Sequence, residues 1–259
     1  MIDLIIKHPL NIDMQFSYYD SIAEDYDRKR KNPWHALVDF LEDIRFKNLV
    51  VSGYCLALGC GNGRNFSLYS QYSNYIIGLD NSIELLKLAQ KNIKENPDNF
   101  KDKSLNIELI LSSLQLLPFR PRVIRSVFII AAIHHIRGLN YRISIMKQIY
   151  DILESKGYLI LSVWRKFQKK FKFQFLRDYI SRFLSPKYLK KQKEKGLSEF
   201  GDKYIPWTLS DQGKTYKRFY HFFSHKEVKK LVNHFRLLEL KKLGGPHKKD
   251  NFFILAKKF

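Results

Sequence analysis

The sequence is poor in several features, and each shortage excludes a class of protein. It has two cysteines, Cys55 and Cys60, in 259 residues, too few for a disulfide framework or a cysteine-based zinc site. Its longest apolar run, residues 127–133, is far shorter than the roughly 20 residues that span a membrane. The first residues, MIDLIIKHPLNID, resemble neither a signal peptide nor a membrane anchor. We therefore expect an intracellular, cytoplasmic protein.

Acidic residues are also scarce, with 25 Asp and Glu against 46 Lys and Arg, which gives a formal net charge of +21. A surplus of this size attracts polyanions, so it favours a nucleic acid or an anionic membrane as partner. A generally lysine-rich proteome would produce the same surplus without such a partner. The apolar content of 45% is enough for one sizeable core.

From residue 54 the sequence alternates between apolar runs and amphipathic stretches. Apolar runs predict strands at 54–58, 75–80, 106–111, 126–133, 158–164, 236–241 and 252–257. Helices are predicted from about residue 62 and at 82–94, 140–155 and 225–234, with Ser82 as an N-cap. Nearly all-apolar strands that alternate with helices are typical of an α/β fold, a parallel sheet covered on both faces.

This pattern divides the chain into four parts. Residues 1–50 are expected to form helical segments, with Pro33 near a helix start, and residues 51–164 a cofactor-binding core. Residues 165–215 interrupt the pattern as a basic, aromatic insertion, because residues 165–195 hold twelve Lys or Arg and two acids. Residues 216–259 complete the core. A solvated amphipathic helix and a membrane-surface helix remain alternatives for the insertion.

Residues 55–65, CLALGCGNGRN, place glycines at 59, 61 and 63 after a predicted strand. Glycines permit a tight turn and close approach of a ligand, and the following helix offers free N–H groups. Asp80 ends the next predicted strand, where its carboxylate can bind ribose hydroxyls. Arg64 stands where a nucleotide dehydrogenase has its last glycine, which favours S-adenosylmethionine over NAD. A tight loop without a ligand is the alternative.

Three core motifs, LGCGNGRN, GLDNS and IAAIHHI, resemble those of class I methyltransferases. Four outer motifs, YYDSIAEDYDRKRKNPW, KYIPWTLS, RFYHFF and KDNFFILAKK, are similar to the tRNA wobble-uridine methyltransferase family. The resemblance runs with gaps over about residues 18–258. It implies a Rossmann-like fold with a seven-stranded sheet, and methyl transfer from S-adenosylmethionine to the carboxylate of 5-carboxymethyluridine in tRNA. It gives the basic insertion the role of binding tRNA, with no membrane partner.

The resemblance also assigns roles to residues. The residues implied to bind the cofactor are Tyr18, Gly59, Cys60, Gly61, Asn62, Gly63, Asp80, Asn81, Ser113, Leu114 and Ala131. Those implied to act on the acceptor are Arg30, His135, Trp164, Arg218 and His221. Those implied to bind the substrate base are Trp34, Trp207 and Tyr220. For His134 and His135, for each tryptophan and for the tyrosines at 18 and 19, core packing is the alternative.

Three acids expected of the fold are absent, because Ala57, Ser113 and Arg125 stand in their places. A neutral hydroxyl accepts a weaker hydrogen bond than a carboxylate does, so we expect weaker cofactor affinity. A non-catalytic tRNA-binding paralogue is therefore one alternative function. Another is a methyltransferase that acts on a different RNA base or on a small molecule.

The resemblance further implies a partner, a small zinc-binding activator protein that adds a strand to the sheet. In the methyltransferase topology the third strand lies at an edge. The segment at 106–119 is apolar there and carries few charges, which makes it a template for strand addition. We expect no metal in the chain itself.

Overall fold

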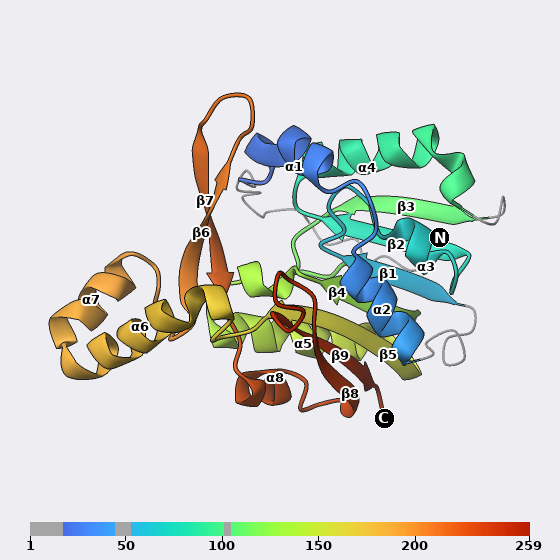
Figure 1. Ribbon diagram of the computed structural model, residues 1–259. Helices are drawn as coiled ribbons and strands as arrows, with labels where there is room; N and C mark the ends of the chain where they lie inside the picture. Colours follow the sequence, from blue (N-terminus) through green and yellow to red (C-terminus); the bar gives the residue numbers. More distant parts are fainter. Residues whose placement is uncertain (1–17, 45–52, 101–104) are drawn as a thin grey trace.

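A computed structural model describes residues 18–44, 53–100 and 105–259 (Figure 1). A seven-stranded sheet in the order β3-β2-β1-β4-β5-β9-β8 lies at its centre. The strands are β1 (Tyr54–Leu58), β2 (Tyr75–Asp80), β3 (Asn106–Leu111), β4 (Ile124–Ile130), β5 (Leu153–Trp164), β8 (Arg236–Leu243) and β9 (Asn251–Lys257). Strands β1 to β5 pair in parallel, and β9 pairs antiparallel with both β5 and β8. The mostly parallel α/β sheet predicted from the sequence is confirmed, with β3 at one edge.

Helices flank this sheet on both sides. The α-helices are α1 (Ala23–Lys29), α2 (His35–Asp43), α3 (Phe66–Tyr69), α4 (Ile83–Glu95), α5 (Leu139–Ile152), α6 (Lys172–Leu184), α7 (Pro186–Glu194) and α8 (His225–Leu231). Short 3-10 turns are η2 (Asp20–Ile22), η4 (Pro97–Asn99), η5 (Ile133–His135) and η6 (Lys169–Phe171). The Ser82 side chain accepts a hydrogen bond from the N–H of Leu85, so the predicted cap of α4 is present.

Two apolar clusters cover the two faces of the sheet, because alternate strand residues point to opposite sides. Leu56, Val127 and Leu159 belong to the cluster with residues of α5 and α8. The second cluster contains residues of α2, α3 and α4 together with the strand residues Cys55, Phe128, Tyr158 and Ile160. A parallel sheet buried on both faces needs continuous apolar strands, which is why the strand ranges could be read from the sequence.

Several element boundaries differ from the prediction. The helix expected from about residue 62 begins only at Phe66, because the glycine turn extends to Gly63. The strand expected at 126–133 ends at Ile130, and η5 follows. The helix expected at 140–155 ends at Ile152, where Leu153 takes an extended conformation and begins β5.

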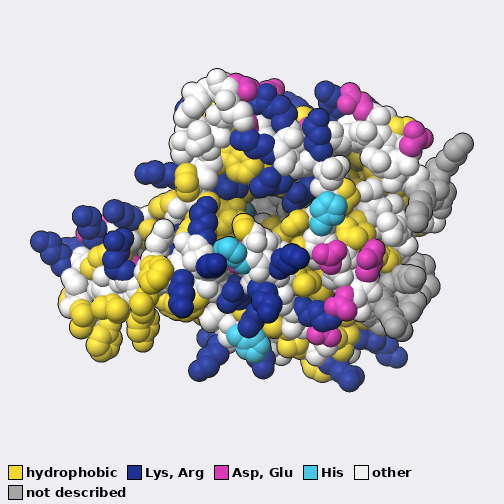
Figure 2. Space-filling view, in the orientation of Figure 1, with side chains coloured by type: hydrophobic (Ala, Val, Ile, Leu, Met, Phe, Trp, Pro, Cys, Tyr) yellow, Lys and Arg dark blue, Asp and Glu magenta, His cyan; other side chains and the backbone are white. Residues whose placement is uncertain are grey.

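The insertion contains a separate two-stranded sheet, β6 (Asp202–Thr208) and β7 (Thr215–His221), which form an antiparallel hairpin. It therefore continues to His221, beyond the boundary expected at residue 215. In Figure 1 the hairpin extends toward α1, while α6 and α7 project away from the central sheet. On the face shown in Figure 2, Lys and Arg side chains surround the hairpin and line one side of the α6–α7 projection.

Candidate active site

The predicted glycine turn follows β1 at the carboxyl edge of the sheet. The φ angles of Gly59, Gly61 and Gly63 are +67°, +58° and +73°, in the left-handed region that favours glycine. A Cβ on Gly59 would lie 2.5 Å from the Cβ of Ala132, and one on Gly63 would lie 2.7 Å from the Phe66 ring. Both the conformation and the packing of the turn therefore require glycine.

Asp80 ends β2 directly beside this turn. Its Oδ2 accepts a hydrogen bond from the N–H of Gly61 at 2.8 Å, and its Oδ1 accepts one from the N–H of Ser82 at 3.0 Å. Burial raises the pKa of Asp80, while these hydrogen bonds act in the opposite direction. A carboxylate offers about four acceptor positions, so each oxygen can still accept a ribose hydroxyl. This geometry fits the predicted cofactor.

Asn62 lies within the turn and is 1% exposed. Its Nδ2 donates to Asp27 Oδ1 at 2.7 Å and to the carbonyl of Arg30 at 2.9 Å, and Asn92 of α4 donates to the same Asp27 oxygen at 2.9 Å. These bonds hold α1 against the turn. Within the described residues, the buried Asn62 Oδ1 has no hydrogen-bond partner. An orphaned acceptor of this kind suits the ammonium group of S-adenosylmethionine.

The other residues predicted to bind the cofactor, Tyr18 apart, follow the carboxyl ends of β1 to β4: Cys60, Asn81, Ser113, Leu114 and Ala131. Ala131 has a φ of +54°, which is unusual for a residue with a Cβ. Its N–H donates to Ser162 Oγ at 3.0 Å. Tyr18 is 38% exposed and its ring lies 5.2 Å from that of Tyr19. The cofactor roles of these residues stay predictions.

Arg218 lies on β7 between two aromatic rings. Its guanidinium carbon is 4.6 Å from the ring centroid of Trp207 and 5.2 Å from that of Tyr220. Trp164, at the end of β5, has its ring 4.6 Å from Tyr220. The structure thus brings together four predicted residues, Arg218, Trp207, Tyr220 and Trp164, which we call the arginine–aromatic cluster. Arg218 is 7% exposed, and among the described residues its Nε has no hydrogen-bond partner.

His135 joins this cluster from η5. Its Nδ1 lies 2.8 Å from the carbonyl oxygen of Phe219, which can only accept, so Nδ1 carries the proton. Its Nε2 lies 2.9 Å from the hydroxyl of Tyr19 and accepts from it. Burial lowers the pKa of His135 to about 3, so the ring is neutral at pH 7. The neighbouring His134 stacks on Tyr220 at 4.7 Å.

Asp25 is a site residue that the sequence prediction missed. It is 3% exposed and fastens α1 to the hairpin. Its carboxylate accepts from Trp207 Nε1 at 2.7 Å, from the N–H of Ser210 at 3.0 Å and from Lys29 Nζ at 2.6 Å. These bonds hold the pKa of Asp25 below its usual range, although burial acts in the opposite direction. No local pattern indicates its contact with the hairpin, because Trp207 and Ser210 are about 180 residues away along the chain.

Two predicted site residues lie elsewhere. His221 is buried below the hairpin, where its Nδ1 donates to Asp202 Oδ1 at 2.8 Å. Side chains alternate along a strand, so His221 points away from the face of β7 that carries Arg218 and Tyr220. Trp34 packs on Phe253 of β9, with ring centroids 5.0 Å apart. The structure therefore does not bring these two residues into the arginine–aromatic cluster, and their site roles stay predictions.

Arg30 lies at the rim of the cluster rather than within it. Its guanidinium carbon is 5.7 Å from the ring centroid of Trp207. Its Nη1 donates to the carbonyl of Lys29 at 3.0 Å. Because Arg30 is exposed, its side chain is free to turn toward a ligand at the cluster.

The three positions without the expected acids lie in different surroundings. Ala57 is 2% exposed and borders a cavity of about 20 Å³, which is also lined by Phe66, Tyr69 and Phe128. Arg125 lies near the amino end of β4, at the opposite end of the strands from the glycine turn. Its Nη1 is 4.0 Å from the Glu154 carboxylate. Ser113 Oγ accepts from the N–H of Gln115 at 3.2 Å. Ala57 and Ser113 therefore lie toward the carboxyl ends of the strands, where the glycine turn is, and Arg125 does not.

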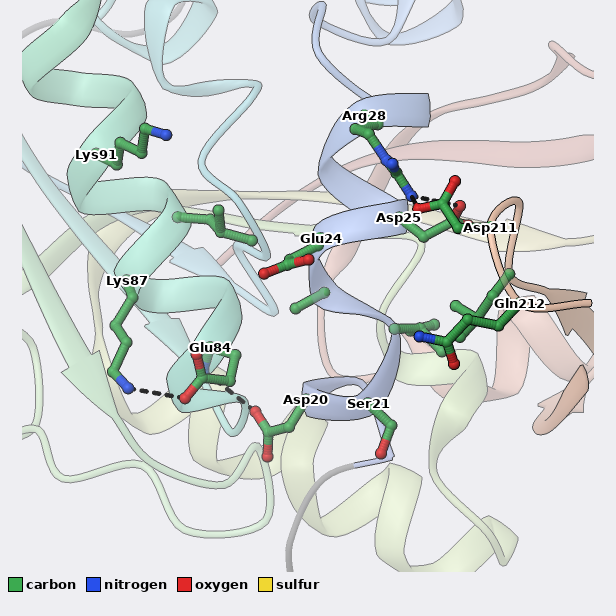
Figure 3. A pocket seen from close by; sticks show the side chains of 14 residues that line it. Asp20, Ser21, Glu24, Asp25, Arg28, Glu84, Lys87, Lys91, Asp211 and Gln212 are labelled. Atoms are coloured by element: carbon green, nitrogen blue, oxygen red, sulfur yellow. Dashed lines mark hydrogen bonds and ion pairs between the residues drawn. The ribbon is translucent and has the colours of Figure 1, made fainter. Parts of the chain in front are cut away.

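A larger surface cavity of about 480 Å³ opens between η2, α1, α4 and the hairpin tip (Figure 3). Its lining mixes carboxylates such as Asp20, Glu24 and Glu84 with the cations Arg28, Lys87 and Lys91. None of the predicted site residues lines it. The described residues contain no group of three or more His, Cys, Asp or Glu placed to hold a metal ion. In the same part of the chain, no helix is long and apolar enough to cross a membrane.

Comparisons with known proteins agree with this geometry. Residues 56–161 match the family described as "Methyltransferase domain". The chain is 25% identical over 265 residues to the tRNA (carboxymethyluridine(34)-5-O)-methyltransferase of Schizosaccharomyces pombe, covering 93% of this chain and 94% of that protein. A Xenopus tropicalis protein with the same enzymatic name is 24% identical over 93% of this chain, but the match spans only 40% of that longer protein.

A solved structure shares the fold. The crystal structure of an S-adenosylmethionine-dependent methyltransferase from Methanosarcina mazei superposes with a TM-score of 0.65 at 20% identity, over 83% of this chain and 97% of that one. The strand order, the glycine turn with Asp80 and the family match lead to one conclusion. The chain is an S-adenosylmethionine-dependent methyltransferase of the class I fold, with its methyltransferase domain at residues 56–161.

Proposed function

We propose that the chain methylates the carboxylate of 5-carboxymethyluridine at the wobble position of tRNA and so forms a methyl ester. The observation that carries this proposal is Arg218, which is buried between Trp207 and Tyr220 and leaves Nε without a partner among the described residues. A buried guanidinium with a free N–H suits a carboxylate, which it can bind through two parallel hydrogen bonds. The names of the relatives support the same acceptor.

The chemistry requires little acid–base catalysis. A carboxylate of ordinary pKa is already an anion at pH 7, so it needs no general base. The neutral His135 is consistent with this requirement, since its pKa is about 3. When bound, S-adenosylmethionine supplies a methyl group on a positively charged sulfur. Gly59, Asp80 and Asn62 hold the cofactor, and the remaining task of the protein is to position the acceptor.

The rings around Arg218 moderate its charge. Negative charge on the acceptor is lost as the ester forms, so a very strong ion pair would stabilise the ground state more than the transition state. Trp207 and Tyr220 attract the guanidinium electrostatically through cation–π contacts, so the acceptor carboxylate is not its only partner. Trp207 also donates to Asp25, so in this proposal it orients Arg218. The partly exposed Trp164 is then the ring that stacks on the uracil.

The basic insertion is proposed to bind the tRNA backbone. Residues 165–195 hold twelve Lys or Arg and two acids, and cations gather on the projecting arm in Figure 2. Such residues neutralise phosphates and release counterions, so affinity for tRNA should fall steeply with salt. The partner at the edge strand is a separate proposal. Among the described residues, β3 pairs with β2 along its full length and ends the sheet order, so this strand is where a small zinc-binding activator is proposed to add a strand.

The test compares Arg218→Lys with Arg236→Lys, a matched change at an exposed arginine on β8. Purified proteins are incubated with radiolabelled S-adenosylmethionine and tRNA that carries 5-carboxymethyluridine, with and without the activator. Arg218→Lys should lower kcat/KM by about 10- to 150-fold, which corresponds to a charged hydrogen bond worth about 1.5–3 kcal/mol. Arg236→Lys should retain full activity. Full activity in Arg218→Lys would remove that arginine from the acceptor site.

The form of the label separates the alternatives. A base-labile methyl ester on the wobble nucleoside supports the proposal, whereas a base-stable methyl group identifies another RNA-base methyltransferase. Absence of both label transfer and calorimetric cofactor binding would overturn the proposal and leave the non-catalytic tRNA-binding paralogue as the alternative.

A further inference from the structure

Helix α6 carries a stripe of large apolar side chains that no described residue covers. Phe173 is 81% exposed, Phe183 is 83% exposed and Leu184 is 70% exposed, and Leu176 and Ile180 continue the stripe at 49% and 45%. Figure 1 shows this helix in the arm that projects from the body, and Figure 2 shows apolar side chains along one side of that arm. Contiguous exposed apolar surface of this kind marks an interaction site.

The stripe is distinct from the packing face of the helix. Phe175 is fully buried among Phe171, Tyr220 and Phe222, and Asp178 is bound to Arg182 and Tyr188. These residues already hold α6 in the insertion. The outward stripe is therefore not needed to hold α6 in the insertion.

The spacing of the stripe is that of a helix-pairing seam. Phe173, Leu176, Ile180 and Phe183 follow one another at intervals of three, four and three residues, as a and d positions of a heptad do. Lys172 and Arg177, both exposed, occupy the first flanking g and e positions, and the exposed Tyr179 and Leu184 occupy the next ones. In paired helices those positions face side chains of the partner helix and select its charge.

We propose that the outward face of α6 docks an amphipathic helix of another protein, with apolar residues along its centre and Asp or Glu at its rim. The apolar stripe takes no part in the proposed methyl transfer or in the proposed activator contact, although Lys172 and Arg177 are also among the cations proposed to bind tRNA.

Three other occupants suit the face less well. In a dimer of two α6 helices, Lys172 and Arg177 would face the same cations of the second copy. The two acids of residues 165–195 could not offset this charge, because Asp178 is already paired and Glu194 lies on α7. RNA bases stack on rings and guanidinium planes, whereas Leu176 and Ile180 at the centre of the stripe have neither. A helix that lies in a membrane surface turns a charged face to water, whereas the opposite face of α6 is packed in the insertion.

The experiment measures binding of two fluorescent 21-residue helical peptides to the full chain by anisotropy. Both have leucine at a and d, with glutamate at e and g in one peptide and lysine in the other. We expect the glutamate peptide to bind at least tenfold more tightly. Phe173→Ser/Phe183→Ser should lose this binding, while Tyr141→Ser, which changes a 60% exposed ring on α5, should keep it. Circular dichroism and thermal melting confirm that each variant folds.

A charge reversal makes the test specific to α6. Lys172→Glu/Arg177→Glu should shift the preference toward the lysine peptide, although the net charge of the chain stays strongly positive. Equal binding of both peptides, or an unchanged preference in the reversed variant, would overturn the proposal. So would concentration-dependent self-association, binding to phosphatidylserine vesicles or binding to oligouridine RNA, if Phe173→Ser/Phe183→Ser abolished that instead.

Discussion

The interactions that hold the core together differ from those that attach the insertion to it. The central sheet is buried through aliphatic contacts, and side chains such as Leu56, Leu79 and Val127 are completely inaccessible to solvent. The insertion is joined to the body through aromatic contacts, such as that of Tyr220 with Trp164, and also through charged contacts. Lys166 Nζ contacts both carboxylate oxygens of Glu227, at 2.7 and 2.8 Å. The apolar contacts of the core are non-directional and tolerate substitution by apolar residues of similar volume. Each charged contact of the insertion instead depends on one particular partner.

The candidate site draws on both regions. The core supplies the backbone of the glycine turn and the Asp80 carboxylate. The hairpin supplies the side chains of Arg218, Trp207 and Tyr220, of which Trp207 is bonded to Asp25. Cofactor binding should therefore respond to changes in the core, and acceptor chemistry to changes in the hairpin and its attachments.

The largest effect should come from a pair of glycine substitutions, one in each region. Gly59 and Gly213 have similar φ angles, +67° and +62°, but a Cβ on Gly59 would lie 2.5 Å from Ala132, whereas nothing lies within 4 Å of one on Gly213. Gly59→Ala should abolish detectable cofactor binding in calorimetry and lower the free energy of unfolding by several kcal/mol, about as overpacking does. Gly213→Ala should cost only the left-handed backbone, about 1–2 kcal/mol. Equal losses in the two variants would break the distinction between core and hairpin.

A smaller effect should separate cofactor binding from catalysis. Asp25→Ala leaves the buried indole N–H of Trp207 without its acceptor, which costs about 1–3 kcal/mol, and also removes the acceptor of the Ser210 N–H. Methyl transfer should fall at least about tenfold, and hydrogen exchange should accelerate across residues 205–218. Cofactor affinity should change less than activity does.

The control for this variant is Asp211→Ala. Asp211 is 63% exposed and pairs with Arg28 at 2.6 Å, and such surface pairs contribute little to stability, about 0–1 kcal/mol. This variant should behave like the wild type in activity and in hydrogen exchange. If Asp25→Ala behaved like Asp211→Ala, the hairpin would not depend on its buried attachment.

The predictability of the chain follows the same division. The ranges of β2 and β3 were correct to the residue, because buried parallel strands are continuous apolar runs bounded by polar positions. The cap of α4 and the glycine turn were also predicted, since each is specified by residues a few positions apart.

The hairpin was harder to predict, because its contacts join distant parts of the chain. Composition indicated a basic insertion, but not that residues 216–221 form the second strand of its sheet. The structure brings the predicted residues Arg218 and Tyr220 together with Trp164, whereas His221, one residue after Tyr220, points to the opposite side of β7. Strand alternation could have separated them, had the strand been recognised. Nothing in the sequence near Asp25 indicated that it would contact Trp207 and Ser210.

The smallest effect concerns the junction of the two regions, where His135 of η5 bonds Phe219 of the hairpin. The folded state keeps this ring neutral with a pKa of about 3, whereas an unfolded histidine has a pKa near 6.5. Between those values the unfolded chain binds more protons, so stability is complete above about pH 6.5 and falls as the pH decreases. His135 alone should lower the free energy of unfolding by about 1.4 kcal/mol between pH 7.5 and 5.5.

Urea denaturation at these two pH values tests this expectation. His135→Asn keeps a donor for the Phe219 carbonyl but does not titrate, so its loss between pH 7.5 and 5.5 should be smaller by about that amount. His234→Asn removes an exposed histidine and should show the full wild-type loss. Asp25, whose pKa is lowered, does not interfere, because its contribution is lost only below about pH 4. A His135→Asn variant as pH-sensitive as the wild type would mean that the ring is charged in the folded state, and the hydrogen-bond pattern at the junction would have to be reversed.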